Sequence, residues 1–202
     1  MSLRYSYTVL APIYDAFVEP FTSAARRDNL ALLPTTSDAD VLLVGIGSGL
    51  DIPLLPRGPR YAGLDLTPAM LERARRKAAA AHLDIRLELG DARRLPYAGP
   101  TFDAVVLHLI LAVTPDPGQV LEEAARVLWP GGQILILDKF LRPGQRAPLR
   151  RLISPLAGLL ASRTDVVFER VLAQTPELEL VSDQPALAGG WFRRIVLRKA
   201  RP

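Results

Sequence analysis

The chain has 202 residues, of which 49% are hydrophobic and 23% charged, close to the usual proportions of one globular domain. This composition excludes a disordered tail, a collagen-like fibre and a coiled coil. The absence of cysteine excludes disulfides, cysteine-zinc and iron–sulfur sites and a cysteine nucleophile, and with only His82 and His108 we expect no metal site. The formal net charge is +4, made of −3 from residues 1–138 (13 basic, 16 acidic) and +7 from residues 139–202 (12 basic, 5 acidic).

The sequence contains no segment of the length that a membrane span requires. Its longest apolar stretches, residues 105–113 and 153–161, are far shorter than the about 20 residues of a spanning helix. The first residues also lack the apolar run of a signal peptide. We therefore expect a soluble protein in the cytoplasm.

Apolar runs of strand length alternate with helical patterns through residues 40–140. We expect strands at residues 40–45, 60–66, 84–91, 101–110 and 132–140. Residues 68–82 have the pattern of a helix, with Thr67 as its N-cap and proline at its first position. A further helix is expected to begin at Gly118 and to stop at Trp129–Gly132.

Two more strand-like runs lie near the C-terminus, at residues 177–187 and 191–199. The short glycine-containing connection between them predicts an antiparallel hairpin. The alternation of strands and crossover helices before them predicts a parallel sheet. We therefore expect an α/β fold, Rossmann-like, with a seven-stranded, mostly parallel sheet, helices on both faces and a C-terminal antiparallel hairpin.

Ligands of such sheets bind beyond the carboxyl ends of the strands, so the residues that follow each strand are the candidates. The first strand ends in the glycine loop, Gly45-Ile46-Gly47-Ser48-Gly49, whose glycines permit positive φ and a close approach of the backbone to a ligand. A plain turn can have the same pattern. Asp65 ends the second strand, 20 residues after Gly45, where a carboxylate can accept hydrogen bonds from both hydroxyls of a ribose. Together they indicate a cofactor that contains a nucleoside.

Two cofactor classes remain open on these residues. A nicotinamide dinucleotide site would need its third glycine where this chain has Leu50, and Pro53 and Pro56 do not suit a long helix directed at a pyrophosphate. The other class is a nucleoside-containing cofactor that is not a nicotinamide dinucleotide. For such a cofactor, the Asp91 carboxylate after the third strand can accept from an adenine amino group, and the N–H of Ala92 can donate to a ring nitrogen. The alternative is that Asp91 only caps a turn.

Four stretches, VLLVGIGSGLDIPLL, YAGLDLTPAMLERARRK, LELGDARRLPYAGPTFDAVV and RVLWPGGQILILDKF, together resemble the class I S-adenosylmethionine-dependent methyltransferases. The resemblance covers roughly residues 5–140, and the C-terminal hairpin suits the same fold. The motifs APIYD, GIGSGLDIPLLPRG and GGWFRRIVLRK narrow it to the branch of the ubiquinone/menaquinone methyltransferases and the bacterial phosphatidylethanolamine N-methyltransferases. The implied cofactor is S-adenosyl-L-methionine, with S-adenosyl-L-homocysteine as its product.

The resemblance also implies the cofactor contacts. The glycine loop would line the methionine part, Asp65 would hold the ribose hydroxyls and Leu66 would lie against the adenine. The implied set is Tyr14, Gly45, Ile46, Gly47, Gly49, Asp65, Leu66, Asp91, Ala92 and His108.

The chain departs from the family at Leu43, where an acidic residue usually stands two positions before the first glycine. In the family that residue commonly helps to hold the amino group of the cofactor, so the source of this contact is open. Backbone carbonyls of the glycine loop are one alternative.

The resemblance divides the chain, expected to be a single domain over residues 1–202, into four parts. They are N-terminal lid helices at 1–35, a cofactor-binding core at 40–140, a helical insertion or cap at 142–175 and the hairpin at 176–200. In the first part, Tyr14 and Asp15 would fold over the cofactor as a lid, unless Tyr14 is an ordinary packing residue.

Methyl transfer from a sulfonium is an in-line displacement, for which an enzyme mainly supplies position and exclusion of water. A hydroxyl or protonated-amine acceptor also needs a base. The catalytic candidates are His108, at the end of the fourth strand, and Asp138, at the end of the fifth. His108 could instead orient the substrate or only hydrogen-bond in the pocket, and Asp138 could be a turn or surface carboxylate.

Residues 142–163 carry five arginines and no acid, and their leucines can share one face of a helix. This pattern suits peripheral contact with an anionic membrane, binding of an acidic substrate or a cap over the site. With 6% aromatic residues and no stacking array, we expect no nucleic-acid partner. The sequence thus predicts methyl transfer to a small molecule, such as a lipid head group or a quinone-like compound. The alternatives are cofactor binding without catalysis and an NAD-dependent oxidoreductase.

Overall fold

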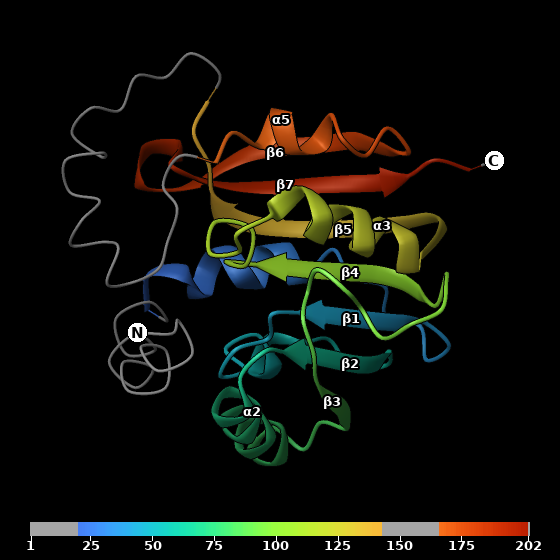
Figure 1. Ribbon diagram of the computed structural model, residues 1–202. Helices are drawn as coiled ribbons and strands as arrows, with labels where there is room; N and C mark the ends of the chain where they lie inside the picture. The colour runs from blue at the N-terminus through green and yellow to red at the C-terminus, as the bar shows by residue number, and fades with distance from the viewer. Residues whose placement is uncertain (1–19, 143–165, 202) are drawn as a thin grey trace.

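The computed structural model describes residues 20–142 and 166–201. Seven strands form one sheet in the order β3-β2-β1-β4-β5-β7-β6 (Figure 1). The strands are β1 (Asp40–Val44), β2 (Arg60–Asp65), β3 (Ile85–Leu89), β4 (Phe102–His108), β5 (Leu128–Lys139), β6 (Leu178–Leu187) and β7 (Phe192–Lys199). Strands β1 to β5 are parallel to one another, and β7 pairs antiparallel with both β5 and β6. The expected sheet and its C-terminal hairpin are thereby confirmed.

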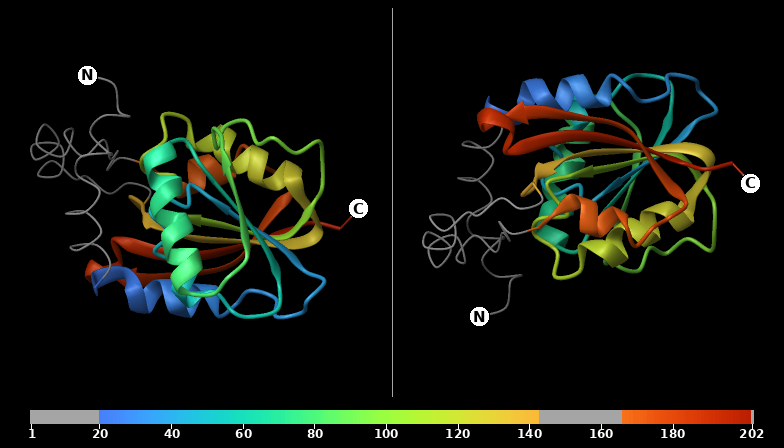
Figure 2. Two further views of the ribbon diagram at one scale, coloured as in Figure 1. Left: turned by 90° about the horizontal axis from the view of Figure 1, so that it is seen from below. Right: turned by 90° about the horizontal axis from the view of Figure 1, so that it is seen from above.

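Helices cover both faces of this sheet, as expected (Figure 2). The helical residues 20–30 and α2 (Pro68–Ala80) pack on one face, and α3 (Pro117–Val127) and α5 (Phe168–Leu172) pack on the other. The strand order reverses between β1 and β4, so the carboxyl ends of these two strands flank the position where such folds bind ligands.

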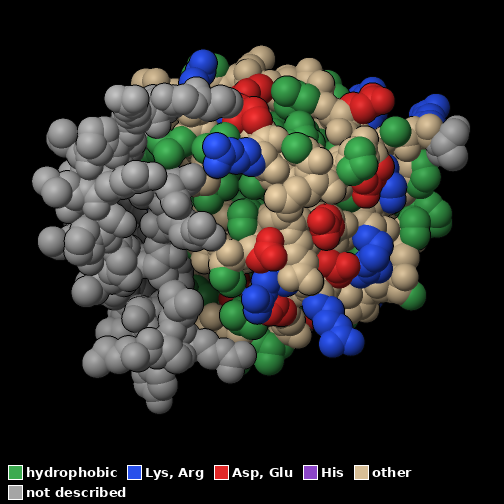
Figure 3. Space-filling view, turned by 45° about the horizontal axis from the view of Figure 1, so that its top comes forward, with side chains coloured by type: hydrophobic (Ala, Val, Ile, Leu, Met, Phe, Trp, Pro, Cys, Tyr) green, Lys and Arg blue, Asp and Glu red, His purple; other side chains and the backbone are tan. Residues whose placement is uncertain are grey.

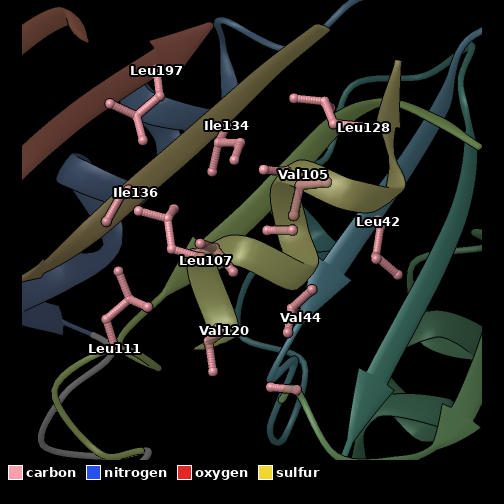
Figure 4. Close-up of a cluster of buried hydrophobic side chains, with 14 of the residues drawn as sticks. Leu42, Val44, Val105, Leu107, Leu111, Val120, Leu128, Ile134, Ile136 and Leu197 are labelled. Atoms are coloured by element: carbon pink, nitrogen blue, oxygen red, sulfur yellow. The ribbon is translucent and has the colours of Figure 1, made fainter. Parts of the chain in front are cut away.

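Strand β1 shows why the sheet is buried on both sides. Successive side chains of a strand point to opposite faces, so an unbroken apolar run contributes to two cores. Leu42 and Val44 join the core beneath α3, whereas Val41 and Leu43 join the core beneath residues 20–30 and α2. Figure 4 shows part of the first core, in which side chains from β1, β4, β5 and α3 meet.

Two local expectations differ from the structure. Helix α3 ends at Val127, and β5 already begins at Leu128, which pairs with Phe102 of β4. Pairing with a neighbouring strand thus ends the helix before the Trp129–Gly132 stretch does. Thr67 precedes α2 as expected, but its side chain makes no capping hydrogen bond.

The C-terminal hairpin neutralises some of the basic charge of the last third. Arg193 on β7 is buried and binds Asp183 of β6 through its Nε at 3.0 Å and Glu169 of α5 at 2.8 Å. Acidic and basic side chains lie side by side across the described part of the face in Figure 3. In the described part of the chain, no helix combines the length and apolar character needed to span a membrane.

Candidate functional site

The glycine loop, which follows β1, has the positive φ angles that its glycines permit. Gly45, Gly47 and Gly49 have φ angles of +67°, +57° and +82°, a region that residues with a Cβ rarely adopt. A Cβ on Gly49 would lie 2.7 Å from Ile52 Cδ1, but a Cβ on Gly47 would meet only the carbonyl oxygen of Gly45, at 4.0 Å. As far as the described residues are concerned, the backbone at Gly47 therefore faces space into which a ligand can reach.

Asp65 at the end of β2 is directed at this loop. One carboxylate oxygen, Oδ2, accepts from the N–H of Gly47 at 2.9 Å, and Oδ1 accepts from the N–H of Thr67 at 2.9 Å. Burial raises the pKa of Asp65, although these backbone donors oppose the shift. A carboxylate has about four acceptor positions, so Asp65 can also accept from a ligand. The structure thus brings the loop and the acidic residue together, with the half-exposed Leu66 beside them.

Asp91 and Ala92 follow β3 at the same edge of the sheet. Asp91 Oδ1 accepts from the N–H of Arg93 at 2.9 Å, and Asp91 Oδ2 lies 2.6 Å from the Arg93 guanidinium. The hydrogen bond from Arg93 holds the pKa of Asp91 below its ordinary value. The carboxylate therefore does cap a turn, and a ligand at this position would share it with Arg93. Ala92 is buried next to it.

His108 ends β4 and is held at both ring nitrogens by buried side chains. Its Nδ1 lies 2.9 Å from Asp51 Oδ1, and its Nε2 lies 3.0 Å from Asn29 Nδ2. Asn29 Nδ2 also donates to the carbonyl oxygen of Ile136 at 3.2 Å. Because a carbonyl can only accept, the amide nitrogen of Asn29 must face it, and its other hydrogen then points at His108 Nε2. Nε2 of His108 therefore accepts from Asn29, and Nδ1 donates its proton to Asp51 Oδ1.

The same network reaches the helix at residues 20–30 through an ion pair. Arg26 donates to Asp51 Oδ1 at 2.8 Å and to Thr22 Oγ1 at 3.0 Å, and both members of the ion pair are more than nine-tenths buried. Burial alone would raise the pKa of Asp51, but the neighbouring Arg26 and His108 bring this pKa well below its ordinary value. Asp51 therefore remains ionised, and its ion pair ties the N-terminal helix to the segment behind the glycine loop.

Asp138 does not join His108. In the parallel pair β4–β5, His108 lies opposite Leu137, so Asp138 projects to the other face of the sheet. Asp138 is fully buried, and its two oxygens accept from the N–H groups of Ala112 at 3.0 Å and Lys139 at 2.8 Å. It is thus not a surface carboxylate; it holds the turn after β4.

The stability of the protein should depend on the protonation of Asp138. Burial raises its pKa to about 6, above the about 3.9 of an unfolded chain, so the folded protein binds this proton more tightly. As the pH rises from about 4 to about 7, the unfolding free energy of the wild type should fall by up to about 3 kcal/mol relative to Asp138→Asn. Urea unfolding of both proteins at several pH values measures this difference. Parallel pH profiles would contradict it.

Sequence reasoning missed Asp51, Arg26 and Asn29. The signal for Asn29 and Arg26 is polarity on the buried face of the helix at residues 20–30, which also carries Leu30. Asp51, after the glycine loop, has no such signal. Two further sequence hypotheses cannot be placed. Tyr14 and Asp15 lie outside the described residues, as does nearly all of the arginine-rich stretch at 142–163.

Comparison with known proteins shows to which family this chain belongs. A family model described as a methyltransferase domain matches residues 42–136. Phosphatidylethanolamine N-methyltransferase of Cereibacter sphaeroides is 35% identical over 183 residues, and the match covers 89% of each chain. Demethylmenaquinone methyltransferase of Deinococcus radiodurans is 38% identical over 144 residues, covering 68% of this chain and 60% of the other.

Solved structures show the same fold. Geranyl diphosphate C-methyltransferase from Streptomyces coelicolor A3(2), in complex with Mg²⁺, geranyl diphosphate and S-adenosyl-L-homocysteine, superposes with a TM-score of 0.72. The match covers 89% of this chain and 81% of that one, at 15% identity, so the likeness concerns the fold alone.

Proposed function

This chain belongs to the class I S-adenosylmethionine-dependent methyltransferases, and from that premise we propose that it transfers a methyl group to the amine of a lipid head group. The observation that carries the cofactor half of the proposal is the placement of the Asp65 carboxylate, 2.9 Å from the N–H of the open Gly47. The acceptor half is supported by the phosphatidylethanolamine N-methyltransferase of Cereibacter sphaeroides, which matches along nearly the whole chain.

The described residues suit the cofactor part by part. The open backbone at Gly47 admits the methionine part, with Gly45, Ile46 and Gly49 shaping the loop around it. We assign the ribose hydroxyls to Asp65, the adenine face to Leu66, and the adenine edge to Asp91 and Ala92. The segment between β1 and β2 contains only one turn of 3-10 helix, η1 (Ile52–Leu54), which offers no long helix to a pyrophosphate. This argues against a dinucleotide.

S-adenosyl-L-methionine, when bound, supplies a methyl group already activated by its sulfonium. The chain then has to position the acceptor and exclude water. We assign His108 a positioning role rather than that of a base, because Asp51 and Asn29 occupy both of its ring nitrogens. We assign Asp138 neither a positioning role nor that of a base, because its side chain projects to the face of the sheet opposite His108. An ammonium acceptor would therefore lose its proton to solvent before it enters the site.

We further propose that the chain is one domain in four parts, with residues 1–35 as lid, 40–140 as cofactor core, 142–175 as cap and 176–200 as hairpin. Residues 142–163, with their five arginines, would hold the protein peripherally at an anionic membrane, where a lipid acceptor lies. A demethylated quinone is the second acceptor, favoured by the match to the demethylmenaquinone methyltransferase of Deinococcus radiodurans.

The proposal is tested in two steps with the purified protein. Calorimetry with S-adenosyl-L-homocysteine and with NAD should detect binding of the first only, and binding of NAD alone would overturn the cofactor assignment. Methyl-labelled S-adenosyl-L-methionine is then offered with vesicles of phosphatidylethanolamine, vesicles of phosphatidylcholine, or a demethylated menaquinone. Label in the phosphatidylethanolamine arm supports the lipid amine, label only with the quinone replaces it, and binding without any label indicates a cofactor-binding protein without this activity.

A further inference from the structure

Asp51 carries a carboxylate oxygen that accepts no hydrogen bond from the described residues. Its Oδ1 receives both the Arg26 guanidinium and His108 Nδ1, at 2.8 and 2.9 Å. Among the described residues, none donates a hydrogen bond to Oδ2. The residue is only 4% exposed, and an ionised carboxylate in such a place costs stability unless its oxygens find donors. Oδ2 is also not one of the fully buried atoms that lack a partner, so it reaches the surface, where a ligand can donate to it.

Asp51 lies directly behind the glycine loop. The N–H of Gly49 donates to the carbonyl of Ile46 at 3.1 Å, and the N–H of Ile52 donates to the carbonyl of Gly49 at 3.1 Å. These two turns fold residue 51 back against the loop. On the other side, Ile110, two residues after His108, approaches Gly45 so closely that a Cβ there would lie 2.7 Å from it. The glycine loop therefore lies next to both Asp51 and the end of β4 that carries His108.

The charges of Arg26 and Asp51 beside the glycine loop suit a zwitterionic ligand. Arg26 and Asp51 cancel each other as a buried ion pair, and Asn29 and Asp51 occupy both ring nitrogens of His108. A ligand with a lone positive charge would leave a net charge in a buried place, whereas one carrying an ammonium together with a carboxylate adds none. The amino-acid end of S-adenosyl-L-methionine has this chemistry.

We propose that Asp51 binds the ammonium group at the amino-acid end of the cofactor through its free oxygen, an inference that rests on the proposed function. Leu43, at the end of β1, is apolar and buried and cannot supply this contact. The interaction is a charge-assisted hydrogen bond, about twice as strong as one between neutral groups. Arg26 is a positioning residue in this arrangement, because it donates to Oδ1 and leaves Oδ2 available to a ligand.

Calorimetry with two ligands tests the assignment. S-adenosyl-L-homocysteine carries the amino-acid end, and 5′-methylthioadenosine has the same nucleoside without it. Asp51→Asn should weaken binding of the first at least tenfold and change binding of the second by less than twofold. Equal weakening of both ligands would show that Asp51 only supports the loop, and unchanged binding of S-adenosyl-L-homocysteine would exclude the contact. Either result overturns the proposal.

Asp40→Asn is the matched control. It makes the same chemical change in a carboxylate that also pairs with an arginine, Arg60, but at the opposite end of β1, and it should leave both affinities unchanged. If Asp51→Asn does not fold, the double variant Arg26→Met/Asp51→Asn removes both buried charges and is measured in its place, with the same selective loss expected. If the wild type binds neither nucleoside, the proposed function fails and this assignment falls with it; if it binds both equally well, only the assignment falls.

Discussion

Asp65→Ala is expected to weaken the binding of S-adenosyl-L-homocysteine at least tenfold. A carboxylate that accepts from two ribose hydroxyls makes two charge-assisted hydrogen bonds, each worth about 1.5–3 kcal/mol. Losing even one of them exceeds the about 1.4 kcal/mol that corresponds to a factor of ten. The substitution also frees the N–H groups of Gly47 and Thr67, which now donate to Asp65. Calorimetric titration of both proteins measures the change, and equal affinity would refute the ribose contact.

A ligand without one hydroxyl separates the ribose contact from an effect on the loop. The 2′-deoxy analogue of S-adenosyl-L-homocysteine should bind the wild type more weakly than the parent ligand does. In Asp65→Ala the two ligands should bind with similar affinity, because the acceptor of the hydroxyl is gone. A 2′-deoxy penalty that persists unchanged in the variant would place the acceptor elsewhere.

Arg26→Met is expected to cost about 3–5 kcal/mol of unfolding free energy at neutral pH, the usual effect of removing one partner of a buried ion pair. It leaves the Asp51 carboxylate charged, buried and without its cation. Such a loss is a large part of the about 5–15 kcal/mol by which small domains are stable. Urea unfolding followed by circular dichroism measures it. Methionine keeps much of the apolar stem of arginine, so the loss reports mainly on charge.

The pH dependence of this loss has a definite sign. In the wild type the pKa of Asp51 is lowered in the folded state, so its ion pair stabilises the protein above the unfolded pKa of about 3.9 and the contribution is lost as the pH falls. The deficit of Arg26→Met should therefore be complete at neutral pH and shrink only as the pH falls below about 4. Adding Asp51→Asn should restore stability at neutral pH. As a control, Arg60→Met breaks the exposed pair with Asp40 and should cost at most about 1 kcal/mol. A deficit that is equal for both arginines would contradict the buried-pair account.

Most of the fold could be predicted because its signals are local. Branched apolar runs such as residues 40–45 specify strands buried on both faces, and the pattern at 68–82 specifies a helix whose start is marked by a proline. Errors arose at boundaries such as Leu128, where pairing with Phe102 extends β5 into residues that read as the end of a helix. Strand pairing is a non-local interaction, so no local pattern could reveal it.

One part of the candidate site could likewise be predicted from the sequence, and another part could not. The pairing of the glycine loop with Asp65 follows from spacing within one strand–loop–strand unit, and the structure joins them at 2.9 Å. The relation of His108 to Asp138 does not follow from spacing. His108 ends β4 and Asp138 is the last residue but one of β5, yet the register of β4 against β5 directs them to opposite faces of the sheet.

By itself, the sequence determined the order of strands and helices, the glycine loop, its acidic partner and the family of methyltransferases. These depend on residue types at short, constant separations along the chain. Only the tertiary structure decided that Arg26, Asn29, Asp51 and His108 meet, because 79 residues separate the histidine from its amide partner and 57 from its carboxylate. Burial then gives these side chains their roles. In water an arginine and an aspartate interact weakly, but in this buried place Arg26 and His108 lower the pKa of Asp51 and both occupy its Oδ1, which leaves Oδ2 without a donor among the described residues.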